Sequence, residues 1–262
     1  MFPTDHAQQQ YSGMTSLSPP DSSITPDKLV RGFSPQSIAV IGASSNPAKI
    51  GSQILTNIIK GGYQGRIYPI NLKTGTIQGF QAYPSVTDIP EPIDHAVVAL
   101  PASIVPTVLE ECGKKGIPAV TVISAGFKES GEKGAVLEKK LTYICEQYDI
   151  KLLGPNCLGF INTDIQLNAT FSSSDARKGH VILFSQSGAF GTAILDWAKE
   201  VNLGFKYFFS LGNKAVLDET ELLSHWVSTF SDNSENIVFA GYLEDIKQGR
   251  KFMEIVSQIS KH

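Results

Sequence analysis

The feature that most constrains the fold of this chain is a repeated alternation between short, wholly apolar segments and longer segments with helical periodicity. The first apolar segment, residues 38–41, ends at Gly42, and apolar residues then recur three or four positions apart over residues 50–59. This order corresponds to a strand, a glycine turn and a helix. Because neighbouring parallel strands need crossover helices, the alternation predicts an α/β fold with a doubly wound parallel sheet.

The same two kinds of segment recur along most of the chain. Before residue 160 we expect further strands at residues 66–71, 95–100, 119–123 and 151–153, and helices at residues 105–114 and 136–148. After residue 180 we expect strands at residues 181–184, 207–209 and 237–243, and helices at residues 190–199, 221–230 and up to about residue 260. An open sheet usually has about five or six strands, so the three strands of the second series leave an edge that a further strand should cover.

The chain therefore divides into two predicted domains. Residues 1–27 are rich in Ser, Pro, Gln, Thr and Asp and match no targeting peptide, so a disordered tail is predicted there. The first domain is predicted at residues 28–160, a polar, turn-rich linker at residues 161–178, and a partial second domain at residues 179–262. A length of 262 residues is enough for two modest domains.

Composition narrows the class of protein further. Hydrophobic residues make up 42% and charged residues 18% of the chain, which is typical of a globular protein. The 22 basic and 25 acidic residues give a net charge of −3, so nothing favours a nucleic acid or an anionic membrane surface as partner. No apolar stretch approaches the roughly 18 residues of a membrane span. The three cysteines lack CxxC spacing, which argues against a disulfide framework or metal site and favours a reducing cytoplasm.

Two loops that follow strands of the first domain carry candidate anion-binding groups. The turn Gly42-Ala43-Ser44, called the 42–44 turn below, opens a helix, so its backbone amides and the positive helix end can face a phosphate. It lacks the second glycine of the dinucleotide fingerprint GxGxxG, and a plain structural turn is the alternative. Lys73 stands where an NAD enzyme would have a carboxylate, which favours a phosphorylated ribose, as in coenzyme A or NADP. The alternative is a solvated loop cation.

The second domain contributes another candidate anion site. Two serines, an amide side chain and a glycine form the start of a helix: Ser185, Gln186, Ser187 and Gly188, called the 185–188 turn below. Hydroxyls and free amides at a helix start can bind an anion, although a serine that merely caps the helix is the alternative. Glu244 ends a strand on the same edge, where its carboxylate can orient an imidazole. An exposed carboxylate without a role is equally compatible with the sequence.

Cysteine and histidine give no convincing catalytic group. Cys157 is either a nucleophile or an inert core residue, and no histidine lies near it in sequence. The five histidines lie in the tail, at or within predicted elements, or at the last position: His6, His95, His180, His225 and His262. A catalytic base must first have the right geometry, and none of the five has a suitable setting.

Four segments, taken in order, give the chain a resemblance to a known family. They are SPQSIAVIGAS at residues 34–44, GPNCLG at residues 154–159, SQSG at residues 185–188 and SLGN at residues 210–213. From about residue 28 to residue 262, the chain resembles the NDP-forming acyl-CoA synthetases. That group includes the ADP-forming acetate:CoA ligase and, more distantly, the α chain of succinyl-CoA synthetase.

The resemblance implies a Rossmann-like CoA-binding domain followed by a truncated, flavodoxin-like second domain, and it implies roles for particular residues. Gly42, Ala43, Ser44 and Lys73 would face the phosphates of coenzyme A, with Pro101 beside the nucleotide. Asn156 and Cys157 would lie near the thiol end, and the 185–188 turn would hold a phosphoryl group. Glu244 would orient a phosphohistidine, which groups it with Asn156 as catalytic. Leu72 stands where the family usually has proline.

The resemblance also implies a reaction and partners. Such enzymes interconvert an acid, CoA and ATP with an acyl-CoA, ADP and phosphate through an acyl phosphate and a phosphohistidine. The phosphohistidine loop of the family lies beyond the position of His262, and ATP, ADP and Mg²⁺ belong to an ATP-grasp domain or β subunit. We therefore expect this chain alone to bind CoA or acyl-CoA without completing the ligase reaction. A homo-oligomer is compatible with the sequence.

Two other functions remain open from the sequence. The same module can form the CoA-sensing regulatory part of a protein acetyltransferase, which needs no phosphohistidine. An NADP-dependent oxidoreductase would need a catalytic acid near a nicotinamide, and the chain has no good candidate for one.

Overall fold

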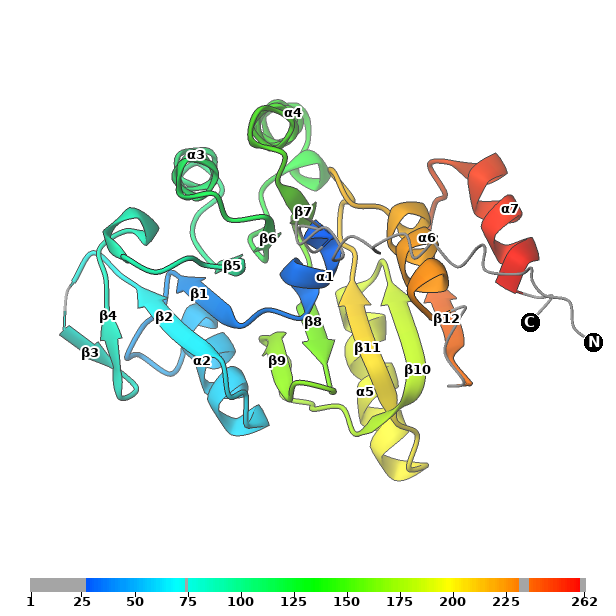
Figure 1. The fold of residues 1–262 in the computed structure, drawn as a ribbon. Coiled ribbons are helices and arrows are strands. Elements are labelled where there is room, and N and C mark those ends of the chain that lie inside the picture. The colour runs from blue at the N-terminus through cyan, green and yellow to red at the C-terminus, as the bar shows by residue number, and fades with distance from the viewer. Residues whose placement is uncertain (1–26, 74, 231–235, 260–262) are drawn as a thin grey trace, which may run out of the picture.

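The computed structural model describes residues 27–73, 75–230 and 236–259, and the chain folds around two β-sheets that lie side by side (Figure 1). The first sheet has five parallel strands in the order β2-β1-β5-β6-β7. They are β1 (Ser37–Ile41), β2 (Arg66–Ile70), β5 (His95–Val98), β6 (Ala119–Val122) and β7 (Lys151–Leu153). All five expected strands of the first domain are therefore present, with ends that differ by one or two residues.

Helices cover both faces of the first sheet, which makes it doubly wound as predicted (Figure 1). Helices α3 (Val105–Lys115) and α4 (Glu132–Tyr148) lie on one face, and α1 (Lys28–Phe33) and α2 (Ile50–Gly61) on the other. Alternate residues of β1 point to the two faces: Ile38 joins the core under α1 and α2, and Ala39 joins the core under α3 and α4. Because β1 is buried on both faces, its sequence is apolar without interruption.

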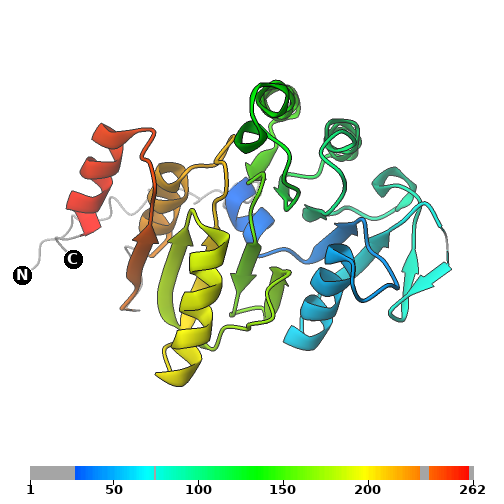
Figure 2. The same cartoon turned by 180° about the vertical axis from the view of Figure 1, so that it is seen from behind.

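The second sheet is mixed and has five strands in the order β12-β10-β11-β8-β9. Strand β10 pairs in parallel with β11 and β12, whereas β8 pairs antiparallel with β11 and β9. The strands are β8 (Gly159–Asn162), β9 (Leu167–Thr170), β10 (Lys178–Ser185), β11 (Phe205–Ser210) and β12 (Val238–Tyr242). Helix α5 (Gly188–Glu200) packs on one face, visible in Figure 2, and α6 (Glu219–Phe230) and α7 (Gly249–Ile259) pack on the other.

Strands β8 and β9 occupy part of the segment that was expected to be a linker, and they cover the edge of β11. Their polar side chains, which suggested turns, are buried and hydrogen-bonded. Asn162 is fully buried, and its side-chain nitrogen donates to the backbone oxygen of Phe33 over 2.8 Å. The second sheet thus has two more strands than the apolar pattern predicts. These are β8 and β9, which contain buried polar residues and pair with β11 and with each other. The domain boundaries given above stay a prediction.

Several short elements were not predicted from the sequence. They are α1, the hairpin of β3 (Gly75–Ile77) and β4 (Phe80–Ala82), and the 3₁₀ helices η1 (Val86–Asp88) and η2 (Lys128–Ser130). The predicted tail at residues 1–27 lies outside the described residues except for Asp27, which caps α1 by accepting from the amide of Leu29. None of the helices in the described ranges combines the length and apolar character needed to cross a membrane.

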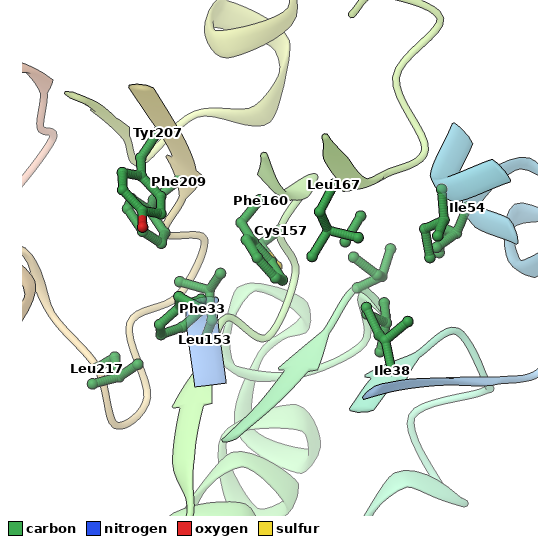
Figure 3. Close-up of a cluster of buried hydrophobic side chains, with 14 of the residues drawn as sticks. Phe33, Ile38, Ile54, Leu153, Cys157, Phe160, Leu167, Tyr207, Phe209 and Leu217 are labelled. Carbon is green, nitrogen blue, oxygen red and sulfur yellow. The ribbon is translucent and has the colours of Figure 1, made fainter. Parts of the chain in front are cut away.

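One buried apolar cluster extends from the first sheet to the second. Figure 3 shows Ile38 and Ile54 of the first domain and Tyr207 of β11 at opposite ends, with Phe33, Phe160 and Phe209 between them. The ring of Phe33 meets that of Phe160 at 5.0 Å and 88°, and that of Phe209 at 5.1 Å and 89°. These edge-to-face contacts hold the two sheets together through a common core.

Candidate functional site

A cleft of about 760 Å³ lies where loops at the carboxyl ends of both sheets meet. The loops after β6 and β7 contribute one side, and the loops after β10, β11 and β12 contribute the other. In open α/β sheets, ligands bind beyond the carboxyl ends of the strands. The common core therefore brings together the edges at which each sheet is expected to bind a ligand.

The 42–44 turn is shaped by two glycines. Gly42 has a φ of +94°, and a Cβ there would lie 2.4 Å from the backbone oxygen of Ala99. Gly51, the second residue of α2, approaches the turn even more closely, since its Cβ would lie 2.0 Å from the oxygen of Gly42. The start of α2 can therefore touch the end of β1. No side chain caps this helix start, where Lys49 is the N-cap residue, so its amides are not blocked by a capping group.

Gly51 was missed by the sequence analysis, although it has the role expected of the glycine that brings a helix close to the phosphate turn. The motif search looked for GxGxxG spacing, whereas here the close-packing glycine follows Gly42 by nine positions. A search for glycine in the first turn of the following helix would have found it.

Replacing Gly51 by alanine is expected to destabilise the protein by about 1–3 kcal/mol, because the added methyl group forces the start of α2 away from the 42–44 turn. Helix propensity alone predicts the opposite, a gain of up to about 1 kcal/mol. Urea unfolding would measure the change. Gly249→Ala is the matched control, since Gly249 also starts a helix and has open space around its Cβ position. An equal increase in the free energy of unfolding in both variants would contradict the close approach of α2 to the 42–44 turn.

The loop after β2 is linked to the 42–44 turn by Asn71. The side-chain nitrogen of Asn71 donates to the oxygen of Ala43 over 2.7 Å, and its side-chain oxygen accepts from the amide of Lys73 over 2.8 Å. Lys73 is exposed beside this turn, and Pro101 is exposed after β5. Neither lines the cleft, and nor do Gly42, Ala43 or Ser44. The proposed phosphate contacts therefore lie along the edge of the first sheet, outside the cleft.

Asn156 and Cys157, in the loop after β7, both line the cleft. Asn156 is exposed, has a φ of +57° and donates from its side chain to Asn213 over 3.3 Å. Cys157 is only 5% exposed, and its thiol contacts the oxygen of Val122 at 3.4 Å. Burial raises the pKa of the Cys157 thiol to about 12, so it is protonated at neutral pH. This environment favours the inert alternative over a nucleophile.

The 185–188 turn connects β10 to α5, and three of its four residues, Gln186, Ser187 and Gly188, line the cleft. Ser187 is the N-cap residue of α5, with its hydroxyl accepting from the amide of Phe190 over 3.3 Å. The Ser185 hydroxyl is buried and donates to the oxygen of Ser187 over 2.6 Å. Both serines thus stabilise the turn itself, which leaves the helix start as its anion-binding element.

Gln186 connects the 185–188 turn to the loop after β12. Its side-chain oxygen accepts from the amides of Glu244 and Asp245 over 2.9 and 3.2 Å, and its side-chain nitrogen donates to the Asp245 carboxylate over 2.6 Å. Glu244 is exposed and lines the cleft. The structure therefore brings Glu244, Asn156 and residues 186–188 of the 185–188 turn to one cavity.

Asn213, which had no assigned role, joins the two domains beside the cleft. Its side-chain nitrogen donates to the carboxylates of Glu129 over 2.6 Å and Glu138 over 2.7 Å, and its backbone oxygen accepts from the ammonium of Lys128 over 2.6 Å. Burial raises the pKa of Glu129, but hydrogen bonds from Asn213 and the amides of Gly126 and Phe127 outweigh burial, so the pKa lies below its ordinary value. Its carboxylate is charged at neutral pH.

No histidine within the described residues lines the cleft. His95 is buried in β5, where its ring nitrogens contact the oxygen of Gly32 and the hydroxyl of Thr121 at 2.7 and 2.8 Å. His225 lies in α6 and pairs with Asp27 at 3.0 Å. Both rings therefore have structural contacts away from the cleft.

Comparison with known protein families matches both parts of the chain. Residues 36–163 match the CoA binding domain, and residues 178–262 match the succinyl-CoA ligase like flavodoxin domain. The two matched segments contain the two sides of the cleft.

The chain is also similar in sequence to named acetate–CoA ligases. The chain is 44% identical over 233 residues to acetate–CoA ligase [ADP-forming] I subunit alpha of Pyrococcus furiosus, an alignment that covers 87% of this chain and 50% of the relative. It is 45% identical over 233 residues to acetate–CoA ligase [ADP-forming] I of Archaeoglobus fulgidus, covering 89% of this chain and 33% of the relative. The chain thus spans a third to a half of the length of these relatives.

A solved structure has the same fold. It is described as dinucleotide forming acetyl-coenzyme A synthetase 1 of Ca. Korarchaeum cryptofilum in complex with phosphate and ADP, and it superimposes with a TM-score of 0.83. The sequence identity is 40%, and the superposition covers 88% of this chain and 49% of that one. The arrangement of the two domains is therefore shared with a CoA ligase.

Proposed function

Because the chain belongs to the NDP-forming acyl-CoA synthetase family, as its CoA-binding portion, we propose that it supplies the CoA site of an enzyme that interconverts an acid, CoA and ATP with an acyl-CoA, ADP and phosphate. The observation that carries this proposal is the 760 Å³ cleft, which has the loop of Asn156 on one side and the 185–188 turn on the other. A thiol end and a phosphoryl group can meet there.

Coenzyme A would lie along the edge of the first sheet and enter the cleft with its thiol. The uncapped start of α2, beside the 42–44 turn, offers backbone amides to its phosphates, whereas the amides of Gly42 and Ala43 donate to the backbone oxygens of Ile70 and Val40. Lys73 offers a cation to the phosphorylated ribose. Pro101 would contact the nucleotide, and Asn156 and Cys157 would contact the thiol end. Ile50, the first residue of α2, lines the cleft, so one helix start joins the phosphate region to the thiol region.

The second domain would bind the phosphoryl group that passes between acyl phosphate and histidine. The helix start at the 185–188 turn stabilises negative charge through its amides and dipole, at no cost of reorganisation during the reaction. Glu244, exposed at the same cavity, would hold and orient the imidazole. We assign the steps that need ATP and Mg²⁺ to an ATP-grasp domain or β subunit. The P. furiosus relative, named a subunit alpha, fits such a partner.

The state of the cysteines fits the proposed location in the cytoplasm. Cys112, Cys145 and Cys157 are all buried and unpaired. Proteins with free, structural thiols are typical of reducing compartments.

Replacing Lys73 by alanine is expected to weaken CoA binding by about 1.5–3 kcal/mol, the contribution of a hydrogen bond between charged groups. This corresponds to roughly a ten- to hundredfold higher Kd. Dephospho-CoA lacks the ribose phosphate, so its affinity should be low for the wild type and nearly unchanged by the substitution. Isothermal calorimetry with both ligands measures these differences. Lys60→Ala, an exposed lysine on α2, is the matched control. Equal affinity of the wild type for CoA and dephospho-CoA would overturn the assignment of Lys73.

A further inference from the structure

Lys214, in the loop between β11 and α6, has a fully buried side chain. Its ammonium donates to the Glu219 carboxylate over 2.9 Å, to the Asp245 carboxylate over 2.7 Å and to the backbone oxygen of Asp245 over 2.7 Å. An ammonium has three donors, and all three are used. A buried charge is costly unless its geometry is complete, so this side chain is committed to its partners.

Two of these three contacts are to Asp245, which belongs to the loop after β12. The third partner, Glu219, is itself only 2% exposed and also accepts from the amide of Lys247 over 3.3 Å. The ammonium of Lys247 in turn donates to the backbone oxygen of Lys214. The loop after β11 therefore holds residues 245–247 at several points, with Lys214 at the centre.

Asp245 lies between Lys214 and the 185–188 turn. One of its carboxylate oxygens contacts the ammonium of Lys214 at 2.7 Å and the side-chain nitrogen of Gln186 at 2.6 Å. Gln186 then accepts from the amides of Glu244 and Asp245. Lys214, Asp245 and Gln186 thus form a continuous chain of hydrogen bonds from the interior of the second domain to the turn that lines the cleft.

Lys214 and Asp245 are both charged at neutral pH. Burial by itself lowers the pKa of Lys214, but hydrogen bonds with Asp245 and Glu219 outweigh burial, so the pKa lies above its ordinary value. Hydrogen bonds from Lys214 and Gln186 hold the pKa of Asp245 below its ordinary value. The link between them is therefore an ion pair.

We propose that Lys214 is a positioning residue, which sets the shape of the 185–188 turn and the place of Glu244 by holding Asp245 against Gln186. The inference rests on the proposed role of that turn in binding phosphate. Lys214 does not line the cleft, so any effect on a ligand there must pass through Asp245 and Gln186.

Lys214→Met keeps the length of the side chain and removes its charge. With inorganic phosphate as the probe, we expect an affinity about tenfold lower than that of the wild type, because a displaced turn should lose about one of its hydrogen bonds to the charged phosphate. Gln186→Leu should have a similar effect. Because both residues act through one series of hydrogen bonds, the double variant should bind phosphate no more weakly than either single variant. Independent effects would instead multiply to a phosphate affinity about a hundredfold lower than that of the wild type. CoA affinity should stay within about twofold, because CoA phosphates bind at the other sheet.

Lys151→Met is the matched control. Lys151 in β7 likewise forms an ion pair, at 2.6 Å to Glu221, but among the described residues its side chain makes no hydrogen bond or ion pair with the loop of Asp245. It should lower stability without changing phosphate affinity. A multiplicative double variant, or an equal loss of phosphate affinity in Lys151→Met, would overturn the positioning role.

Hydrogen exchange separates this inference from the proposed function. In Lys214→Met, the amides of Glu244 and Asp245 should exchange faster, while those of β10 and β11 keep their wild-type rates. Unchanged exchange at the two amides would overturn the inference. If wild-type protein binds CoA but no phosphate, the proposed role of the 185–188 turn fails, and the exchange rates still decide whether Lys214 holds the loop.

Discussion

Phe209→Ala is expected to lower the free energy of unfolding by about 3–5 kcal/mol, the cost of removing a large aromatic side chain from a packed core. Phe209 is fully buried, and its ring contacts that of Phe33 at 5.1 Å, Phe184 at 5.6 Å and Trp226 at 6.1 Å. Because Phe33 belongs to the first domain, the loss should spread to both sheets. Denaturant unfolding measures the size of the effect, and hydrogen exchange measures its extent.

The extent of the effect distinguishes a common core from two independent cores. In Phe209→Ala, amides of β1 and β5 should exchange faster along with those of β10 and β11. Phe127→Ala is the control, because Phe127 is fully buried in the core under α3 and α4, which contains little of the second domain. If Phe209→Ala accelerated exchange only in the second sheet, the cluster in Figure 3 would not couple the domains.

The second large effect is a loss of stability in acid that arises from His95. Burial lowers the pKa of His95 from 6.5 to about 4, so below pH 6.5 the unfolded chain binds a proton that the folded chain does not. The contribution of neutral His95 to the free energy of unfolding is therefore fully present above pH 6.5 and is lost as the pH falls towards 4. By then the free energy of unfolding should have decreased by about 3 kcal/mol. Urea unfolding between pH 7.5 and roughly pH 4 measures this slope.

His95→Gln isolates that contribution. A glutamine side chain can donate to the oxygen of Gly32 and accept from the hydroxyl of Thr121, the two contacts of the ring, without titrating. Burial also lowers the pKa of His225, although Asp27 opposes the shift, so part of the acid sensitivity should remain in this variant. His225→Gln gives the complementary measurement. An unchanged slope in His95→Gln would show that His95 is not the group that titrates.

Part of the candidate site follows from the sequence because its signal is local. The 42–44 turn and the 185–188 turn each stand between an apolar strand and an amphipathic helix, and parallel strands in one sheet carry their carboxyl ends to one edge. Asn156 and Glu244 follow strands in the same way, and both line the cleft. That the two edges open onto one cavity depends on the common core, to which Phe33 and Phe209 contribute from different domains.

The sequence by itself determined the five strands of the parallel sheet and helices α2, α3 and α4 of the first domain, because a strand buried on both faces must be apolar throughout. Only the tertiary structure decided the roles of polar residues whose partners are distant along the chain. Asn162 can be buried in a strand because its side-chain amide donates to the backbone oxygen of Phe33, 129 positions away. Lys214 can be a buried cation because Asp245, 31 positions away, accepts hydrogen bonds from its ammonium. A polar residue is stable in the interior only when partners satisfy it there, and those partners are brought together by the fold rather than by neighbouring sequence.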